Sequence, residues 1–186
     1  METVYIGLGA NISGPAGGPE ATLAAAVARL GRLGHVRDRS SLYSTAPVGF
    51  ADQPRFVNAV VALETEMEPR GLLAALLAIE EEFGRDRSAG VRNGPRALDL
   101  DILLFGARQI KEPDLEIPHP RLSERAFVLV PLAEIAPEAI DPRSGRAVRE
   151  LIAALRTAPD AAVRIESHAW KARTGRARKS RKNGSK

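Results

Sequence analysis

Cysteine is absent from this chain of 186 residues. The lack of thiols excludes disulfides, thiolate metal sites and cysteine nucleophiles, and it fits a reducing compartment, so we expect a cytoplasmic protein. No apolar run reaches the roughly 18 residues that a membrane helix needs, and the first residues show no basic segment ahead of an apolar one. We therefore expect a protein that is neither exported nor inserted in a membrane.

Acidic residues are absent from positions 171–186, a stretch that holds eight of the 27 lysines and arginines. Without this stretch the chain has 19 basic and 23 acidic side chains, a net charge of −4, against +4 for the whole. Such a stretch is typical of a solvated, disordered tail, although it could also attract polyanions without sequence preference. We expect one folded domain over residues 1–158, a size that suits a single core, and a basic, disordered tail over 159–186.

The order of hydrophobic runs and helix signals predicts two successive β-α-β units. Strands are expected over residues 3–8, 36–45, 56–65 and 98–105. Helices are expected over residues 20–33, 69–83, 123–130 and 146–156. Pro19 and Pro69 stand where a first helical turn tolerates proline, and Gly34 stands where the first helix should end. We therefore expect an α/β (α+β) fold, a ferredoxin-like split βαβ core with a mainly antiparallel sheet flanked by helices.

Aromatic residues make up only 4% of the chain, and two nucleotide-binding motifs are missing. No GxxxxGK[ST] segment is present, which excludes a P-loop kinase, and Gly7-Leu8-Gly9 lacks the third glycine of a dinucleotide-binding turn. A nucleic-acid-binding module on a ferredoxin-like sheet would account for the basic tail. Such a sheet carries a glycine–aromatic pattern that this chain lacks. This module is the alternative from another functional class, and no specific nucleic acid is expected as a partner.

Asp99 and Asp101 interrupt an otherwise apolar strand. Residues i and i+2 of a strand point to the same face, so the two carboxylates should emerge side by side, with their Cα atoms roughly 6.6 Å apart. The opposite, buried face is expected to consist of Leu98, Leu100, Ile102 and Leu104. Two such carboxylates repel each other unless a cation lies between them, and Mg²⁺ suits oxygen ligands. The pair indicates either a magnesium site or the solvent-facing side of an edge strand.

Glu80 lies in the middle of the apolar stripe of the expected helix 69–83. At about 100° per residue, Leu72 and Leu76 fall in the same arc, whereas Glu81 falls outside it. A buried charge is costly, which favours a functional role for this carboxylate. The alternative is a glutamate that a core arginine satisfies, or one that escapes at the helix end.

The segment 84–96 combines arginine with glycine directly before the aspartate pair. Its arginines are Arg85, Arg87, Arg92 and Arg96, and three glycines accompany them. Arginine forks bind phosphate oxygens in bidentate fashion, and glycines let a segment move as a lid. The same composition is typical of a solvated turn, but the adjacency to Asp99 favours phosphate binding.

His119 lies between Pro118 and Pro120, which restrict the backbone around it. A single histidine is more often structural than catalytic. Because Arg121 and Arg125 follow closely, this group indicates a second phosphate-binding edge.

Together these segments resemble the 6-hydroxymethyl-7,8-dihydropterin pyrophosphokinase family of folate biosynthesis. The resemblance runs from about Tyr5 to about Pro137. It is carried by the ordered blocks Gly9-Ala10-Asn11, then Asp52-Gln53-Pro54 before Phe56-Val57-Asn58-Ala59, then Ile79-Glu80 with Gly84-Arg85, then Gly94-Pro95-Arg96-Ala97-Leu98-Asp99-Leu100-Asp101-Ile102, and finally Ile117-Pro118-His119 with Arg125-Ala126-Phe127. The GPRALDLDILL block is the most specific of them.

The resemblance implies an enzyme that transfers pyrophosphate from ATP to the hydroxymethyl group of the pterin and releases AMP. Asp99 and Asp101 would hold two Mg²⁺ ions that bridge the ATP phosphates. Catalysis would rest on Asp99, Asp101, Arg85 and Arg96. The nucleotide would be contacted by Glu80, Arg85, Arg87, Arg96, Ile102, His119 and Arg125. The pterin would be bound by Thr45, Pro47, Val48, Phe56, Asn58 and Phe127.

Within that pterin site, the resemblance implies that Phe56 and Phe127 clasp the two faces of the ring and that Asn58 bonds to its edge. Three positions depart from the family pattern. Phe56 stands where tyrosine is frequent, Asn93 where an aromatic is common, and Pro120 where tyrosine is often found. A degenerate relative that serves as a scaffold is the remaining alternative, although all the charged site positions are retained. We expect a monomer whose partners are the pterin and ATP, and no residue stands out as a general base.

Overall fold

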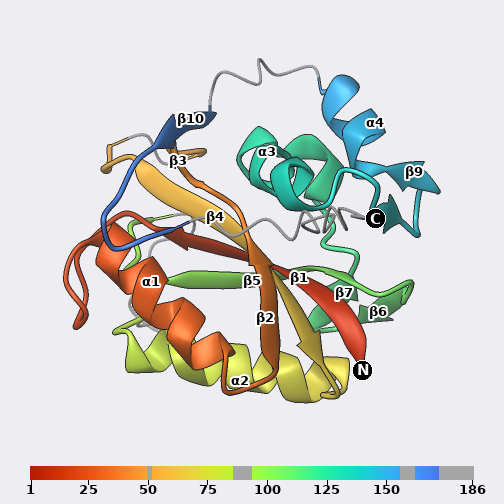
Figure 1. Ribbon diagram of the computed structural model, residues 1–186, viewed down its shortest axis with the longest axis horizontal. Coiled ribbons are helices and arrows are strands. Elements are labelled where there is room, and N and C mark those ends of the chain that lie inside the picture. The colour runs from red at the N-terminus through yellow and green to blue at the C-terminus, as the bar shows by residue number, and fades with distance from the viewer. Residues whose placement is uncertain (50–51, 86–93, 156–161, 172–186) are drawn as a thin grey trace, which may run out of the picture.

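The computed structural model describes residues 1–49, 52–85, 94–155 and 162–171 (Figure 1). Its sheet is built on β1 (Glu2–Ala10) and β4 (Phe56–Thr65), which pair along their lengths. β5 (Asp99–Phe105) pairs with the other edge of β1, while β2 (His35–Arg39) and β3 (Leu42–Thr45) pair with the other edge of β4. Every one of these pairings is antiparallel, and the order β3-β4-β1-β5 is that of the ferredoxin-like core, which confirms the predicted fold.

The strand expected over 36–45 is interrupted at Ser40 and Ser41, so β2 and β3 are separate strands on the same neighbour. Ser40 explains the break. Its backbone N–H donates to the Val60 carbonyl at 2.9 Å, and its hydroxyl accepts from the Val60 N–H at 3.0 Å. A serine hydroxyl that replaces a backbone acceptor interrupts a ladder in this way, and hydrophobicity alone does not reveal it.

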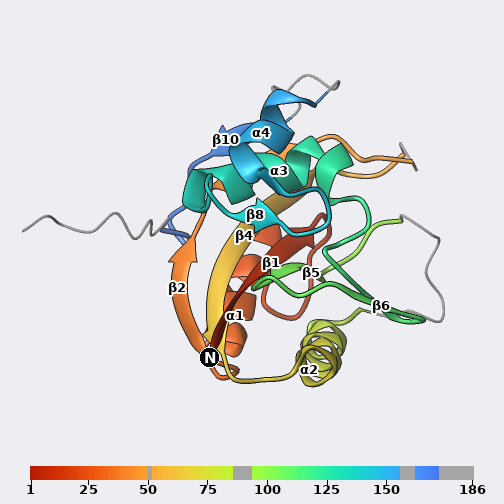
Figure 2. The same ribbon diagram turned by 90° about the vertical axis from the view of Figure 1, so that its right-hand side faces the viewer.

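Two helices cover one face of the sheet. α1 (Pro19–Leu30) lies on β1 and β4, and α2 (Pro69–Glu82) lies beside β5 (Figures 1 and 2). Both begin with the proline that the sequence indicated, but α1 ends earlier than residue 33. Gly34 is needed for another reason, because a Cβ at this position would lie 2.3 Å from the Glu64 carbonyl oxygen. Glycine therefore permits the close approach of this turn to β4.

The larger core lies between these helices and the sheet. It includes Ile6, Leu8, Leu23, Leu72, Leu100 and Ile102, each at most 6% exposed. Burying one such side chain contributes about 1.5–3 kcal/mol. Leu104 was expected on this face but packs on the opposite one, because the register shifts where Tyr5 pairs with Leu104 and Ile6 with Ile102. After the extra residue of this bulge, the side chains of β5 point to the face opposite to the one that strict alternation predicts.

The opposite face is partly covered by α3 (Ala126–Ile135), which packs on β4 and carries α4 (Val148–Ala153) (Figure 2). The helix expected over 123–130 is instead a 3-10 turn (Leu122–Glu124) followed by α3. Two small hairpins complete the fold. They are β6 (Ile110–Glu112) with β7 (Leu115–Ile117), and β8 (Ile140–Asp141) with β9 (Arg146–Ala147).

The folded part of the chain continues past residue 158. β10 (Ala162–Ile165) adds an antiparallel strand to the outer edge of β3, and Trp170 is only 5% exposed. A paired strand and a buried indole therefore follow the boundary that was expected at residue 158. Residues 172–186 lie outside the described part of the chain. Among the helices described, none is long and apolar enough to cross a membrane.

Candidate active site

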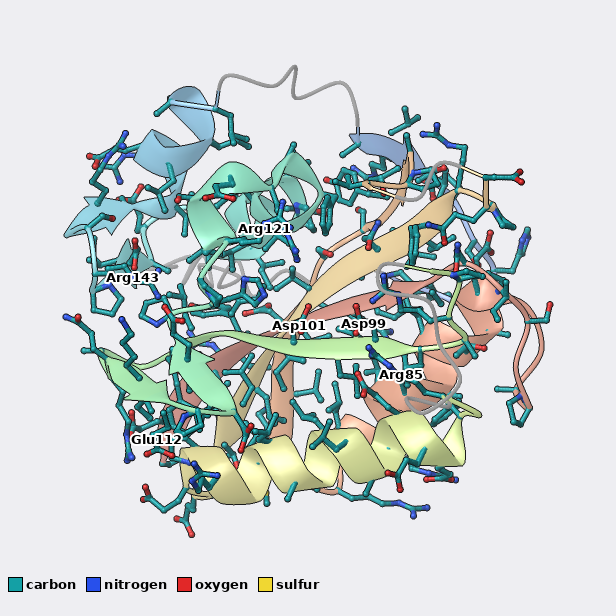
Figure 3. The ribbon with its side chains drawn as sticks, turned by 180° about the vertical axis from the view of Figure 1, so that it is seen from behind. Arg85, Asp99, Asp101, Glu112, Arg121 and Arg143 are labelled. Atoms are coloured by element: carbon teal, nitrogen blue, oxygen red, sulfur yellow. The ribbon has the colours of Figure 1, made fainter. Side chains whose placement is uncertain are left out.

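A pocket opens between the sheet and the start of α3, on the face that α1 and α2 leave free (Figure 3). We call it the site pocket. It encloses about 790 Å³, with open solvent at its mouth included. Its lining comprises Gly7, Leu8, Gly9, Thr45, Ala46, Val48, Phe56, Asn58, Ala59, Val60, Arg96, Asp99, Asp101, Leu103, Arg121, Arg125, Phe127 and Val128.

Asp99 and Asp101 reach the site pocket from alternate positions of β5. Figure 3 shows both side chains on the same side of the strand, away from α2. Leu100, between them, packs into the core under the sheet. The period of two that holds for any strand therefore brings both carboxylates to one place, as the sequence predicted.

The Asp101 carboxyl is poorly solvated. Its pKa is raised to about 7, first because burial disfavours the charged form and next because the charge of Asp99 is close, while Arg125 opposes the rise. Within the described segments Asp101 forms no ion pair. Two adjacent carboxyl groups, one of them without a counterion among the described side chains, favour a bound cation.

The donor set fits magnesium only in partnership with a substrate. Among the described residues, no group of three or more histidine, aspartate or glutamate side chains could hold a metal ion alone. Mg²⁺ commonly takes one or two carboxylates and completes its shell with water and phosphate oxygens. Asp99 and Asp101 could supply those carboxylates, since both line the same pocket.

A buried network fixes Arg85 behind Asp99. Glu80 is 0% exposed, and its Oε1 accepts from Arg85 Nη1 at 2.6 Å and from the Leu100 N–H at 2.7 Å. Arg85 Nη1 also donates to Asp99 Oδ1. The guanidinium thus lies between two carboxylates, which together raise its pKa against the effect of burial. Glu80 therefore orients the arginine that pairs with Asp99.

Arg96 holds the other oxygen of Asp99. Its Nη1 donates to Asp99 Oδ2 at 3.0 Å, and its backbone N–H donates to Asn11 Oδ1 at 2.8 Å. The amide of Asn11 in turn donates to the Pro54 carbonyl at 3.0 Å and to Gln53 at 2.9 Å. One buried asparagine at the end of β1 therefore ties together the entrance to β5 and the entrance to β4.

A polar group closes the other end of the site pocket. Asn58 Nδ2 donates to Thr45 Oγ1 at 2.8 Å, and both side chains are buried. A Cβ at Gly9 would lie 3.0 Å from Asn58 Oδ1, so glycine at this position leaves room for the amide. With one N–H given to Thr45, Asn58 keeps a donor and an acceptor for a ligand.

Two aromatic rings stand in the pocket wall, each under an arginine. The Arg96 guanidinium carbon lies 5.3 Å from the centroid of Phe56, and that of Arg125 lies 5.4 Å from the centroid of Phe127. Such stacking orients a guanidinium and leaves its edge free to bind an anion. The pocket therefore combines flat apolar faces with fixed positive charge.

His119 and Arg121 form a neighbouring edge. Burial first, and the charge of Arg125 next, lower the pKa of His119 to about 4, so the ring is neutral at pH 7. Its Nδ1 accepts from the Arg121 N–H at 3.1 Å, which leaves an Nε2–H donor. Arg143, on the turn between β8 and β9, donates to the Pro118 carbonyl at 2.5 Å and to the Pro120 carbonyl at 3.4 Å. It thereby fixes the segment that carries His119 (Figure 3).

Most of the expected site residues meet at this pocket. Its lining contains Thr45, Val48, Phe56, Asn58, Arg96, Asp99, Asp101, Arg125 and Phe127. Arg85 and His119 lie at its margin, through the contacts described above. Arg87 lies outside the described residues, as do Arg92 and Asn93.

Three expected contacts differ. Glu80 is fully buried and bonds to Arg85, which is the arginine-satisfied alternative. The side chain of Ile102 packs in the core under the sheet, because even positions of β5 before the bulge face α1 and α2. Pro47 is not among the lining residues, although Ala46 and Val48 on either side of it are.

Sequence reasoning missed several contributors to the site. Gly7 and Gly9 alternate on β1 toward the pocket, and glycine inside a strand is a recognised sign of close approach. Arg121, which the sequence placed with His119 and Arg125 at a second phosphate-binding edge, lines the pocket although it was not among the expected nucleotide contacts. Arg143 gave no signal, because its partners are backbone carbonyls distant in sequence.

The family model described as 7,8-dihydro-6-hydroxymethylpterin-pyrophosphokinase matches residues 5–137. The 2-amino-4-hydroxy-6-hydroxymethyldihydropteridine pyrophosphokinase of Pseudomonas aeruginosa is 47% identical over 156 residues, which cover 83% of this chain and 92% of the relative. The protein of the same name from Bacillus subtilis is 48% identical over 133 residues, which cover 70% of this chain and 76% of the relative.

Among solved structures, Plasmodium falciparum HPPK-DHPS is similar with a TM-score of 0.62 at 16% identity. The match covers 82% of this chain and 44% of the Plasmodium chain, so the present chain spans less than half of that protein. At this level of identity the likeness concerns the fold.

Proposed function

Because the chain belongs to the 7,8-dihydro-6-hydroxymethylpterin-pyrophosphokinase family, we propose that its reaction takes place in the site pocket. This reaction is the transfer of pyrophosphate from ATP to hydroxymethyldihydropterin in folate biosynthesis. The observation that carries this assignment is the convergence of Asp99 and Asp101 with Asn58 and the two rings in one cavity. One end of the pocket suits polyphosphate, and the other suits a flat heterocycle.

The pterin is assigned to the end formed by Asn58, Thr45, Phe56 and Phe127. The two phenylalanine rings offer apolar faces for the bicyclic ring, and the free donor and acceptor of Asn58 suit its edge. Ala46 and Val48, which follow Thr45, also line the pocket. These contacts orient the hydroxymethyl group toward the aspartates, which is the positioning that a group transfer between two substrates needs.

ATP is assigned to the end lined by Arg96, Arg121 and Arg125, with Arg85 and the neutral His119 at its margin. Arginines that are already oriented by Asp99 and by aromatic rings offset the charge on phosphate oxygens without further rearrangement. Glu80 acts as a positioning residue for Arg85.

Asp99 and Asp101 are proposed to hold Mg²⁺, two ions by the family resemblance. Bound there, Mg²⁺ would neutralise charge on the phosphates of ATP. The residues of the site pocket position the two substrates. They hold the hydroxymethyl oxygen in line with the β-phosphorus. A bond forms between these two atoms as the bond from the β-phosphorus to the bridging oxygen of AMP breaks, AMP leaves with that oxygen, and the hydroxyl proton passes to water.

The test is a product assay with ATP, Mg²⁺ and 6-hydroxymethyl-7,8-dihydropterin. We expect AMP and the pterin diphosphate in equal amounts, and no AMP when the pterin is left out. Formation of ADP would contradict the proposed transfer. RNA binding that persists in a protein lacking residues 172–186 would instead favour the nucleic-acid module.

We propose one catalytic domain that includes β10 and Trp170, a monomeric state, a cytoplasmic location and no specific nucleic-acid partner. Light scattering on the purified protein measures the molecular mass, and a dimeric mass would contradict the monomer.

A further inference from the structure

The C-terminal segment, residues 162–171, lies beyond residues 5–137 that define the family match, yet it pairs with β3, the strand whose last residue, Thr45, lines the wall of the site pocket. β10 pairs with β3 from Ala162 opposite Thr45 to Ile165 opposite Leu42 (Figure 1). Thr45 lines the site pocket and accepts the hydrogen bond from Asn58. The outer neighbour of this wall is therefore supplied by the end of the chain.

Trp170 holds the other end of β3. Its indole N–H donates to the Ser40 carbonyl at 2.8 Å in a buried position, and the Arg39 guanidinium lies 5.3 Å from the centroid of the indole ring. Ser40 is the residue that interrupts the strand before β3, and it is bonded on its other side to Val60, which lines the pocket. The indole thus fixes the break from which β3 begins.

Glu134 holds β3 from the face opposite the larger core. This carboxylate on α3 accepts from the Ser41 N–H and hydroxyl, each at 2.8 Å, and from the Tyr43 hydroxyl at 2.9 Å. The first turn of α3 carries Phe127, on the other side of the pocket. β3 is consequently tied to the helix that forms the facing wall.

β3 has only four residues, and a short strand with one neighbour frays readily. β10 and Trp170 give it a second neighbour and a fixed starting point. We propose that the C-terminal segment is a positioning element for the pterin end of the site pocket, which it keeps in shape by holding β3 against β4. This inference rests on the proposed function, because it takes the Thr45–Asn58 end as the pterin site.

The test uses the full-length protein with Trp170→Ala and with Trp170→Phe, which keeps a ring but loses the N–H. Calorimetric titration measures the Kd of 6-hydroxymethylpterin with a non-hydrolysable ATP analogue present, and the Kd of the analogue alone. We expect the pterin Kd to rise about tenfold in Trp170→Ala and less in Trp170→Phe, with the analogue Kd unchanged within about twofold. Val163→Thr is the matched control, since Val163 is an exposed residue of β10.

An unchanged pterin Kd in a folded Trp170→Ala protein overturns the inference, and so does an equal loss of affinity for both ligands, which indicates a merely structural role. Asn58→Ala separates the two proposals. If Asn58→Ala binds the pterin as tightly as the original chain, the assigned pterin site is wrong. If Asn58→Ala weakens pterin binding and Trp170→Ala does not, the site stands and the inference fails.

A second measurement needs no variant, in case Trp170→Ala does not fold. Trp170 is the only tryptophan of the chain, so its fluorescence lifetime reports on this segment alone. Coupling between two sites is reciprocal, so pterin binding should protect Trp170 from quenching by acrylamide. A bimolecular quenching constant that stays the same at saturating pterin contradicts the proposed coupling.

Discussion

The Asp101 carboxyl in the pocket wall ionises less readily than an exposed aspartate, because burial and the charge of Asp99 both raise its pKa. In an unfolded chain an aspartate titrates near pH 4, whereas this one titrates near 7 when folded. Between these values the unfolded chain gives up a proton that the folded chain keeps. The metal-free protein should therefore lose stability as the pH rises through this window.

Asp101→Asn removes this titration. In EDTA at pH 8 we expect the variant to melt higher than the original chain, by about 2–4 °C for each kcal/mol recovered, with the difference shrinking toward pH 4. Differential scanning calorimetry measures it, and Asp114→Asn, at an exposed position, serves as the control. Turnover should fall by roughly 100-fold or more, because the proposed Mg²⁺ site would lose a ligand. A variant less stable than the original at pH 8 would contradict the pKa assignment.

Glu80→Gln tests whether the buried carboxylate acts through Arg85. The amide keeps the shape but loses the charge that orients the guanidinium, so we expect roughly tenfold slower turnover and about 1–3 kcal/mol lower stability. Steady-state kinetics and urea unfolding measure the two effects. Glu81→Gln, at the adjacent exposed position, should change neither. Equal behaviour of both variants would rule out the positioning role.

At the residue level, the sequence identified what depends on chemistry and periodicity. The Asp99–Asp101 pair follows from the two-residue period of a strand. For Glu80 in an apolar stripe the sequence favoured a functional role and kept an arginine partner as the alternative, and the structure shows the arginine partner. The sequence did not identify Arg143, because an arginine that binds carbonyls distant in sequence leaves no local pattern. Long-range polar contacts of this kind become visible only when the chain is folded.

Among the elements, the turn between β8 and β9 has a functional consequence through Arg143. Its side chain bonds to two carbonyls of the 118–120 segment and to Glu116 at 3.0 Å. In Arg143→Ala this segment loses its support, so we expect the KM for ATP to rise several-fold while the KM for the pterin stays unchanged. Initial-rate kinetics with each substrate varied in turn measure the difference.

Arg149→Ala is a suitable comparison for Arg143→Ala, since Arg149 is an arginine of α4 that pairs with Glu138 away from the pocket. It should leave both KM values as they are. If Arg143→Ala also left the KM for ATP unchanged, the support of His119 by the hairpin would be without effect.

Elements with strong local signals were predicted well from the sequence. β4 spans residues 56–65 as expected, because ten consecutive residues have strand character and a turn on either side. β10 escaped notice, since it is four residues long, contains an arginine and follows a proline-containing segment. Its stability comes from pairing with β3, which no local pattern encodes.

For the molecule as a whole, we expect the core packed against α1 to contribute stability alone, and the core packed against α3 to contribute both stability and pterin binding. Leu23→Ala, in the core under α1, should cost about 2–5 kcal/mol of stability but leave KM for both substrates unchanged. Leu129→Ala, in the core under α3, should cost as much and also weaken pterin binding, because α3 carries Phe127 into the pocket. Urea unfolding with parallel kinetics measures both. A raised KM in folded Leu23→Ala would refute the division.

This division leaves one side of the protein open to engineering. Neither α1 nor α2 has a side-chain cap at its start. Gly18, at the start of α1, has extended backbone angles, and a Cβ added there would meet no atom within 4 Å. Gly18→Ser could supply the missing acceptor there. A more heat-resistant enzyme could thus be obtained by changing α1, while Glu80 of α2 and the residues of the site pocket stay as they are.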